Sequence, residues 1–264
     1  MNIGILSKRT TMFAGKIKRY YEDNGFNVKI YTLKNLIINE SLLNNDFYIL
    51  KSKNLFFLYA GFFLEANNVP VIPKPYLSFM QKNRIQSHFF IKKADLLTPE
   101  IYLGTLQTLK NQINSSDLPL ILKPVMGSGS KGVKIIKKLE DLNGNDDRIL
   151  YLEKFIKGMH YNVYFIDNHI CTLIKPPISN EHIDMKKVVT PSDIKELINK
   201  WRIALSTKPF FGHLDLVREE SSKELYIVDP GSFPEFTNWK CDISPIDKIC
   251  NLILNQVKDL KKKI

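Results

Sequence analysis

Leu118 to Ile136 read LPLILKPVMGSGSKGVKII, so an apolar segment, one lysine, a glycine-rich turn and a second apolar segment follow one another directly. The first segment predicts a buried strand that positions Lys123, and Val133 to Ile136 predicts the return strand. Glycines let backbone N–H groups approach phosphate oxygens without a Cβ in the way. This order suits a triphosphate-binding loop. Taken alone, the stretch equally fits a tight β-hairpin with a surface lysine.

The next informative segment, Ile149 to Gly158, reads ILYLEKFIKG, an apolar strand that ends in charged residues and turns at glycine. A strand in such a place can offer backbone N–H and C=O groups to the edge of a base while its side chains pack. We therefore interpret Glu153 to Ile156 as a candidate hinge. Without its neighbours, the segment also fits a plain linker between two lobes.

Two aspartates lie on two further predicted strands. Asp215 is inside the segment Phe211 to Val217, and Asp229 ends the segment Leu225 to Asp229. A hairpin closed by the polar residues 218–223 would bring both carboxylates side by side. Two such carboxylates suit Mg²⁺, which also takes substrate phosphate oxygens and waters as ligands. The alternative is a single capped or ion-paired aspartate at each position.

The first third of the chain alternates strand-like with helix-like segments. The strand-like segments are residues 3–6, 27–31, 46–50 and 69–72, and the helix-like segments are residues 12–23 and 55–66. This alternation predicts βαβ units and a small parallel sheet. Prolines end the region, so we place a domain boundary near residue 75, and residues 76–95 have a helical pattern.

The composition limits the class of protein. The 264 residues are 44% hydrophobic and carry a formal net charge of +11, which allows a large core and favours anionic partners. Arginine, the residue that recognises bases and phosphates with a fork of donors, is scarce beside lysine. We therefore expect no nucleic-acid binding.

Location follows from what the sequence lacks. The longest apolar run, Leu55 to Leu64, is too short for a membrane span, and no secretory leader is recognisable. The cysteines Cys171, Cys241 and Cys250 show no CxxC spacing, which indicates reduced thiols. We expect a cytoplasmic protein without a membrane contact.

From about Gln81 to Phe236, the order of these motifs resembles the ATP-grasp superfamily. That family has a lysine before a helix, a Lys-Pro with a glycine-rich loop, an adenine hinge, and two acidic metal positions on neighbouring strands. The matching segments are QKN at 81–83, KP at 123–124 with GSGSKGV at 127–133, LEKFI at 152–156, LDL at 214–216 and VDPGSFP at 228–234. The pattern looks most similar to the branch of ribosomal-protein and cofactor glutamate ligases, with the ATP-grasp inositol polyphosphate kinases as relatives.

The resemblance implies an α/β protein with an ATP-grasp fold, in which two α+β lobes grip ATP, preceded by a small parallel-sheet βαβ domain. The preceding domain would be residues 1–75 and the ATP-grasp domain residues 76–264. Within the latter, the lid lobe would cover about 98–155 and the C-terminal lobe about 156–264.

The resemblance also implies the site residues. The nucleotide contacts would be Lys82, Lys123, Gly127, Ser128, Gly129, Glu153, Lys154 and Ile156, and the magnesium ligands would be Asp215 and Asp229. Our candidates for contacts with the acceptor or the γ-phosphate are Lys175 and Arg218. The implied cofactors are ATP and Mg²⁺.

The implied function is that of an ATP-dependent carboxylate–amine ligase, which acts through an acyl phosphate on an acidic small molecule or peptide. An inositol polyphosphate kinase is the first alternative, and an ATP-binding protein without catalysis is the second. Basic residues lining the cleft opposite the phosphates would favour the kinase. A pocket with one cation and an opening for an amine would favour the ligase.

Two departures from the family pattern bear on these alternatives. Gly231 stands where the family usually continues from its second acid to an asparagine metal ligand. His160 and Asn162 stand where the ligases carry Asp and Arg. These departures concern metal binding and the acyl chemistry, and the sequence predicts neither the acceptor nor the oligomeric state.

Overall fold

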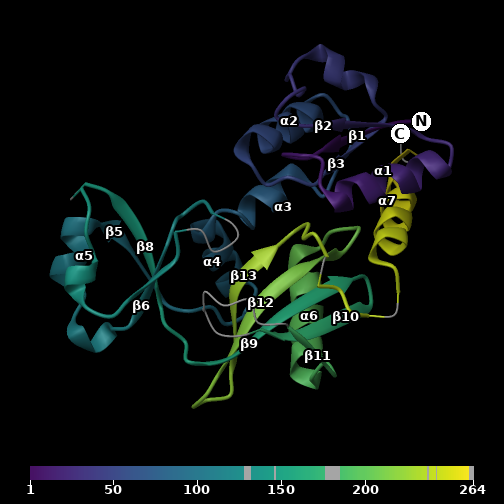
Figure 1. Cartoon of the computed structure of the whole chain (residues 1–264). Coiled ribbons are helices and arrows are strands. Elements are labelled where there is room, and N and C mark those ends of the chain that lie inside the picture. Colours follow the sequence, from purple (N-terminus) through teal and green to yellow (C-terminus); the bar gives the residue numbers. More distant parts are fainter. Residues whose placement is uncertain (128–131, 146, 176–184, 237, 242, 262–264) are drawn as a thin grey trace.

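The computed structural model describes residues 1–127, 132–145, 147–175, 185–236, 238–241 and 243–261 (Figure 1). In this part of the chain the strands form three sheets that follow one another along the sequence. None of the described helices has the length and apolar content needed to cross a membrane.

The first sheet is parallel, with strand order β2-β1-β3-β4. Its elements are β1 (Asn2–Leu6), α1 (Met12–Asp23), β2 (Asn27–Tyr31), β3 (Phe47–Leu50), α2 (Leu55–Ala66) and β4 (Val71–Ile72), with a 3₁₀ turn at Glu40–Asn44. The βαβ prediction is confirmed. The carboxyl ends of β1 and β3 meet at one edge of this sheet, which is where open α/β sheets bind their ligands.

Residues 76–95 are mostly helical, as predicted, and form two helices, α3 (Pro75–Met80) and α4 (Arg84–Lys93). The Asn83 side chain accepts hydrogen bonds from the first N–H groups of α4 and so starts a new helix. Lys82 consequently lies in the break between the two helices rather than on a helix face.

The second sheet is antiparallel, with strand order β5-β8-β6-β7. Its elements are β5 (Ile101–Thr105), α5 (Leu106–Gln112), β6 (Leu120–Lys123), β7 (Lys134–Ile136) and β8 (Ile149–Lys154), with 3₁₀ turns at Ser115–Asp117 and Leu139–Asp141. It has a small core of its own, made of leucines and isoleucines between residues 106 and 152. In Figure 1 this lobe stands to one side of the rest of the molecule.

The third sheet is antiparallel, with strand order β11-β10-β9-β12-β13. Its elements are β9 (Gly158–Ile166), β10 (His169–Lys175), β11 (Lys186–Val188), α6 (Ser192–Leu205), β12 (Phe211–Glu219) and β13 (Leu225–Gly231), followed by α7 (Pro245–Lys261). One face of the sheet buries the apolar side of α6, including Ile194 and the fully buried Trp201. The long strands β9 and β12 form the centre of this sheet.

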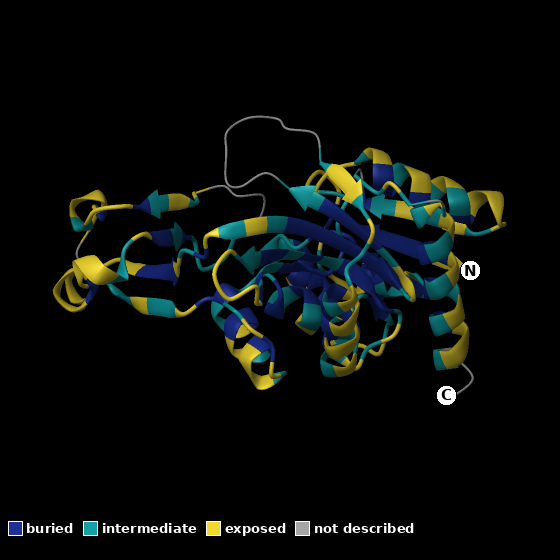
Figure 2. Ribbon diagram, turned by 90° about the horizontal axis from the view of Figure 1, so that it is seen from below, coloured by how far each residue is buried: buried dark blue, intermediate teal, exposed yellow. Residues whose placement is uncertain are grey.

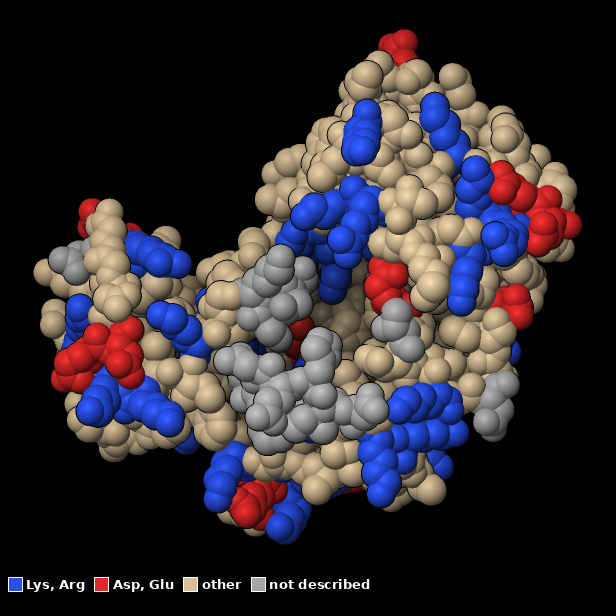
Figure 3. All heavy atoms as spheres, in the orientation of Figure 1, with Lys and Arg blue, Asp and Glu red and all other residues tan. Residues whose placement is uncertain are grey.

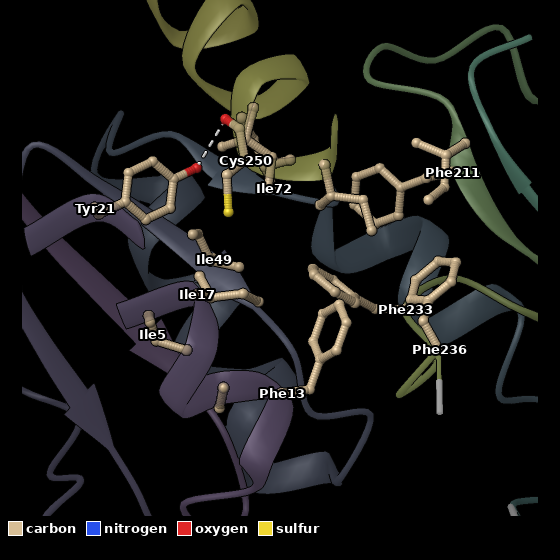
Figure 4. Close-up of a cluster of buried hydrophobic side chains, with 14 of the residues drawn as sticks. Ile5, Phe13, Ile17, Tyr21, Ile49, Ile72, Phe211, Phe233, Phe236 and Cys250 are labelled. Carbon is tan, nitrogen blue, oxygen red and sulfur yellow. Dashed lines mark hydrogen bonds between the residues drawn. The ribbon is translucent and has the colours of Figure 1, made fainter. Parts of the chain in front are cut away.

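The first and third sheets share one hydrophobic core, which Figure 4 shows in part. It joins Ile5 and Ile17 of the first region to Phe211 and Phe233 of the third, and α7 closes it. The Tyr21 hydroxyl donates to a carbonyl of α7, that of Cys250, at 3.0 Å. Figure 2 shows the buried residues concentrated in this joint body, with a smaller group in the lobe of the second sheet.

The structure does not test the predicted domain limits, which stay a prediction. The shared core shows, however, that residues before and after position 75 pack against each other extensively. Of the cysteines, Cys171 and Cys250 are buried in that core, as expected for reduced thiols.

Candidate active site

Lys123 ends β6 and forms a buried ion pair with Glu153 of the neighbouring strand β8. The two side chains are only 9% and 5% exposed. The Lys123 ammonium also donates to the carbonyl of Val228 at 3.2 Å, and the Tyr151 hydroxyl donates to Glu153 Oε1 at 2.8 Å. These contacts hold Lys123 at the junction of the second sheet with β13 of the third.

Asp215 and Asp229 face each other in register on β12 and β13. Asp215 accepts hydrogen bonds from Asn162 Nδ2 and from Lys175 Nζ, each at 2.9 Å. Asp229, which follows Val228 directly, has no hydrogen bond or ion pair with any described side chain. The hairpin predicted from the sequence therefore exists, and it brings the two carboxylates and Lys175 together beside Lys123.

The two carboxylates suit magnesium better than a metal held by protein ligands alone. In the described ranges, no group of three or more His, Cys, Asp or Glu side chains is placed to hold a metal ion. Mg²⁺ usually takes one or two carboxylates and completes its octahedron with phosphate oxygens and waters. Asp215 and Asp229 therefore fit a magnesium ion that binds together with nucleotide phosphates.

Gly231 is required by its neighbour His213, with which it pairs in register on β12 and β13. A Cβ built on Gly231 would lie 1.9 Å from the His213 ring. The imidazole thus fills the space of a side chain at position 231, where the family usually has asparagine. Burial lowers the pKa of His213, so the ring is neutral near pH 7, and its Nδ1 has no hydrogen-bond partner among the described residues.

Gly127 opens the predicted phosphate loop, and a side chain there would collide with Arg84. An ideal Cβ on Gly127 would lie 2.7 Å from Arg84 Nη1, which itself donates to the carbonyl of Pro124. The glycine therefore lets the arginine reach the loop. Ser128 and Gly129 lie outside the described residues, so their predicted phosphate contacts stay predictions.

The predicted hinge uses part of its backbone within the fold. The Lys154 N–H donates to the carbonyl of Glu100 at 2.9 Å. Of the two backbone groups of Lys154, the carbonyl is therefore the one that could contact the edge of a base. The Ile156 side chain is buried. The adenine contacts of Glu153, Lys154 and Ile156 stay predictions, and the structure places all three at the start of the passage from the second sheet to the third.

The structure brings Lys82 to the first sheet and leaves Arg218 outside the site. Lys82 Nζ donates to the backbone carbonyl of Lys53. Arg218 grips Asp193, at the start of α6, with two hydrogen bonds of 2.6 and 3.0 Å. The predicted contact of Arg218 with the acceptor or the γ-phosphate stays a prediction.

A basic cavity of about 360 Å³ opens at the carboxyl ends of β1 and β3. Its cationic lining consists of Lys8, Arg9, Lys51, Lys53 and Lys82, and we call it the basic cavity. Its acidic side chain is that of Glu235, which pairs with Lys51 at 2.8 Å. Figure 3 shows Lys and Arg side chains gathered beside the hollow between the first region and the third sheet.

Lys53, His213 and Tyr151 were not predicted as site residues, although the sequence contains a signal for the first two. Lys53 comes three residues after a predicted parallel strand, where the carboxyl end of a strand marks the ligand edge of a sheet. His213 stands two positions before Asp215, and residues with this spacing on a strand share a face. Tyr151 carried no comparable signal, because a tyrosine in an apolar strand is typical of any core.

Residues 82–201 match the family model described as an ATP-grasp domain. The matched range contains Lys123, Glu153 and Lys175, and it ends before Asp215 and Asp229. The chain contains an ATP-grasp domain. The predicted superfamily and the predicted fold are therefore confirmed.

One curated relative shares sequence with part of this chain. Over 100 residues, which are 36% of this chain and 27% of the relative, the identity to N5-carboxyaminoimidazole ribonucleotide synthase of Aquifex aeolicus (strain VF5) is 32%. The match thus spans little more than a quarter of that protein.

Solved structures agree over nearly the whole chain. A RimK domain protein ATP-grasp from Sphaerobacter thermophilus DSM 20745 has a TM-score of 0.78 at 12% identity and covers 96% of this chain and 100% of its own. The ATP-grasp ligase PsnB, complexed with a minimal precursor, Mg and ADP, has a TM-score of 0.69 at 12% identity and covers 97% and 98%. At such identities the likeness shows a common fold and no more.

Proposed function

We propose that this protein is an ATP-dependent carboxylate–amine ligase that uses Mg²⁺ and acts through an acyl phosphate. The observation that carries the proposal is the pairing of Asp215 with Asp229 in register, with Lys175 bound to Asp215. Lys123 reaches the same place through the carbonyl of Val228, next to Asp229. Two carboxylates and two lysines of an ATP-grasp domain thus converge at the junction of two sheets.

This arrangement suits phosphoryl transfer, in which positioning and charge neutralisation supply most of the catalysis. Lys123 and Lys175 would contact phosphate oxygens, while Asp215 and Asp229 would hold magnesium, whose charge offsets that of the phosphates. A carboxylate oxygen of the substrate attacks the γ-phosphorus, and the bond to the bridging oxygen breaks, so ADP leaves. An amine then attacks the carbonyl carbon, loses a proton and displaces phosphate.

The acid would be a small molecule or a peptide. Support for a ligase comes from the fold shared with the ATP-grasp ligase PsnB, whose structure contains a minimal precursor, Mg and ADP. The excess of lysine in this chain, with its net charge of +11, favours an anionic substrate over a neutral one.

The basic cavity favours a second candidate, an ATP-grasp kinase that phosphorylates a hydroxyl of a highly anionic molecule such as an inositol polyphosphate. Five cationic side chains line this cavity, whereas a ligase for a monocarboxylate needs one cation. The nature of the group that receives the phosphoryl distinguishes the two candidates. A carboxylate must be followed by an amine, and a hydroxyl ends the reaction.

The test is ADP release by the purified protein with Mg-ATP against two substrate pools. One pool contains carboxylic acids with and without amino acids, and the other contains inositol phosphates. We expect release with the first pool that requires an amine. Release with the second pool alone would establish the kinase, and ATP binding without release in either pool would establish a non-catalytic ATP-binding protein.

Asp229→Asn tests the magnesium assignment in the same preparation. We expect the variant to fold normally, because Asp229 makes no hydrogen bond or ion pair with a described side chain, and to bind ATP without dependence on Mg²⁺. Binding of the nucleotide is measured by calorimetry with and without Mg²⁺. If magnesium strengthens ATP binding to the variant as it does to the wild type, Asp229 is not a magnesium ligand.

A further inference from the structure

We infer that the basic cavity is the binding site of the acceptor substrate, and that this acceptor is an oligoanion with at least two anionic groups besides the group that receives the phosphoryl. The inference rests on the proposed function, since it takes the ATP-grasp site as the source of the phosphoryl group. It adds the chemical class of the substrate and the residues that select it.

The first argument is the balance of charge in the cavity. Lys51 is held by Glu235 at 2.8 Å and by the carbonyl of Phe233 at 3.3 Å. The other cations, Lys8, Arg9, Lys53 and Lys82, have no carboxylate within ion-pair distance in the described part of the chain. Several like charges around one cavity repel each other, and a ligand with several negative charges relieves that repulsion.

The desolvation of these lysines points the same way. Burial is the main cause that lowers the pKa of Lys53, and it is also the main cause that lowers the pKa of Lys82. Each of the two also feels a neighbouring cation, Arg84 for Lys53 and Lys53 for Lys82. Burial of these ammonium groups is costly to the folded protein, and an anion in the cavity would reduce that cost.

The second argument is the position of Lys53 between the cavity and the proposed magnesium ligands. Lys53 lines the cavity, and the charges of Asp229 and Asp215 raise its pKa against the effect of burial. Lys51, which also lines the cavity, donates to the carbonyl of Phe233 at 3.3 Å, two residues beyond the end of β13, the strand that carries Asp229. A molecule held in the cavity would therefore lie next to the γ-phosphate.

The third argument is size and fixation. A volume of about 360 Å³ lies in the range of small-molecule sites, about 300–1,000 Å³. The Lys51 ammonium lies over the rings of Phe13 and Phe233, 5.7 and 5.1 Å from their centroids, so its position is fixed before a ligand arrives. The cavity thus suits a compact, highly charged small molecule.

A second hollow of the molecule supplies the matched control. It has a similar volume of about 350 Å³ and also contains two lysines, Lys93 and Lys200. Both side chains are exposed. The hollow is lined by residues of α4 and α6 and the turn after α4, and it shares no residue with the basic cavity. General attraction of anions to a basic protein would involve these lysines as readily as those of the basic cavity.

The experiment is calorimetric titration of the full chain with citrate and with fructose 1,6-bisphosphate, at constant ionic strength and without magnesium. Acetate serves as the monoanion. We expect both oligoanions to bind and acetate not to bind. Lys53→Gln should weaken binding at least tenfold, about 1.4 kcal/mol. Lys200→Gln should leave it unchanged, and saturating ADP should not compete.

Folding is controlled by a second variant. Lys8 and Arg9 are exposed, so the double variant Lys8→Gln, Arg9→Gln should melt like the wild type and still bind the oligoanions more weakly. Tighter binding of citrate would identify carboxylates as the preferred groups of the acceptor, and tighter binding of the bisphosphate would identify phosphates. Either preference supports an oligoanion site.

The inference is overturned if acetate binds as well as citrate, if Lys200→Gln weakens binding as much as Lys53→Gln, or if ADP displaces the oligoanions. The proposed function has a separate readout, the binding of ATP to the same preparation. Oligoanion binding that depends on Lys53, in a protein that does not bind ATP, would overturn the proposed function and the acceptor role together while leaving the anion site in place. ATP binding without oligoanion binding would overturn the inference alone.

Discussion

The charges on the two sides of the candidate active site are handled in opposite ways. On the side of the ATP-grasp domain, Lys123 is paired with Glu153 and Lys175 with Asp215. In the basic cavity, Lys53 and Lys82 have no carboxylate partner among the described residues. Paired charges fix the geometry of a site before its ligand binds, whereas unpaired charges keep their strongest interaction for the ligand. Lysines are thus held in place by carboxylates on one side, whereas on the other side they lack such partners among the described residues.

The largest effect that tests this comparison is expected at the buried pair. Lys123→Met leaves the Glu153 carboxylate buried with only the Tyr151 hydroxyl, so we expect a loss of about 3–5 kcal/mol in the free energy of unfolding. The double variant Lys123→Met, Glu153→Gln should recover most of the loss, since it removes both charges. Unfolding in urea measures both values, and equal stability of the single and double variants would show that the pair is not structural.

A smaller effect on stability is expected at Gly231, which pairs with His213. Gly231→Asn restores the residue that the family usually has, but its Cβ would collide with the His213 ring, so we expect a loss of about 1–3 kcal/mol. The companion variant Gly231→Asn, His213→Ala removes the ring and should regain the stability. Thermal melting distinguishes the two, and a stable single variant would mean that the imidazole moves aside easily.

The pair of Arg218 with Asp193 lies at the edge of the third sheet, and its effect should be smaller still. The Arg218 guanidinium lowers the pKa of Asp193, so this pair stabilises the fold above the ordinary aspartate pKa, and the contribution is lost as the pH falls through the lowered value. Because the carboxylate is 46% exposed, solvent screening limits the gain to about 0–1 kcal/mol.

The corresponding measurement compares Asp193→Asn with the wild type by urea unfolding at neutral and at acidic pH. We expect the variant to be slightly less stable at neutral pH and equally stable in acid. If catalysis in the assay above also collapses in Arg218→Gln while stability does not, Arg218 acts in the site after all.

The smallest effect on stability is expected in the basic cavity. Lys53→Gln removes a cation that has no partner among the described residues, so the free energy of unfolding should stay within about 0.5 kcal/mol of the wild type. The hydrogen bond that Lys82 donates to Lys53 uses the backbone carbonyl and survives the substitution. A loss as large as that of Lys123→Met would mean that Lys53 holds the fold, and the contrast between the two sides would disappear.

Local patterns in the sequence predicted much of the fold. The helices α1 and α2 begin and end where the spacing of apolar residues indicated, and the facing of Asp215 and Asp229 follows from one hairpin. The break at Asn83 escaped prediction because a helix-starting side chain looks like any polar residue inside an apolar pattern. The pairing of Arg218 with Asp193 could not be predicted either, since Asp193 is distant in sequence.

The basic cavity could not be predicted from the sequence, for a different reason. Its approach to Asp229 depends on the core that joins the first sheet to the third, and that core is assembled from segments of the whole chain. Composition gave only the excess of lysine. It could not tell which lysines would gather at one edge of a sheet.

The packing of α1 against α7 has a consequence for how the chain is made. Tyr21 and Cys250, which share a hydrogen bond, are separated by 229 positions. Tyr21 packs on Phe26 and Phe47 of the first region, but its contact with α7 is missing on the ribosome until residues 245–261 emerge. Such distant contacts form slowly, and exposed apolar surface favours aggregation meanwhile. The first sheet of this protein is thus synthesised early, and its core is completed only when the last helix has been made.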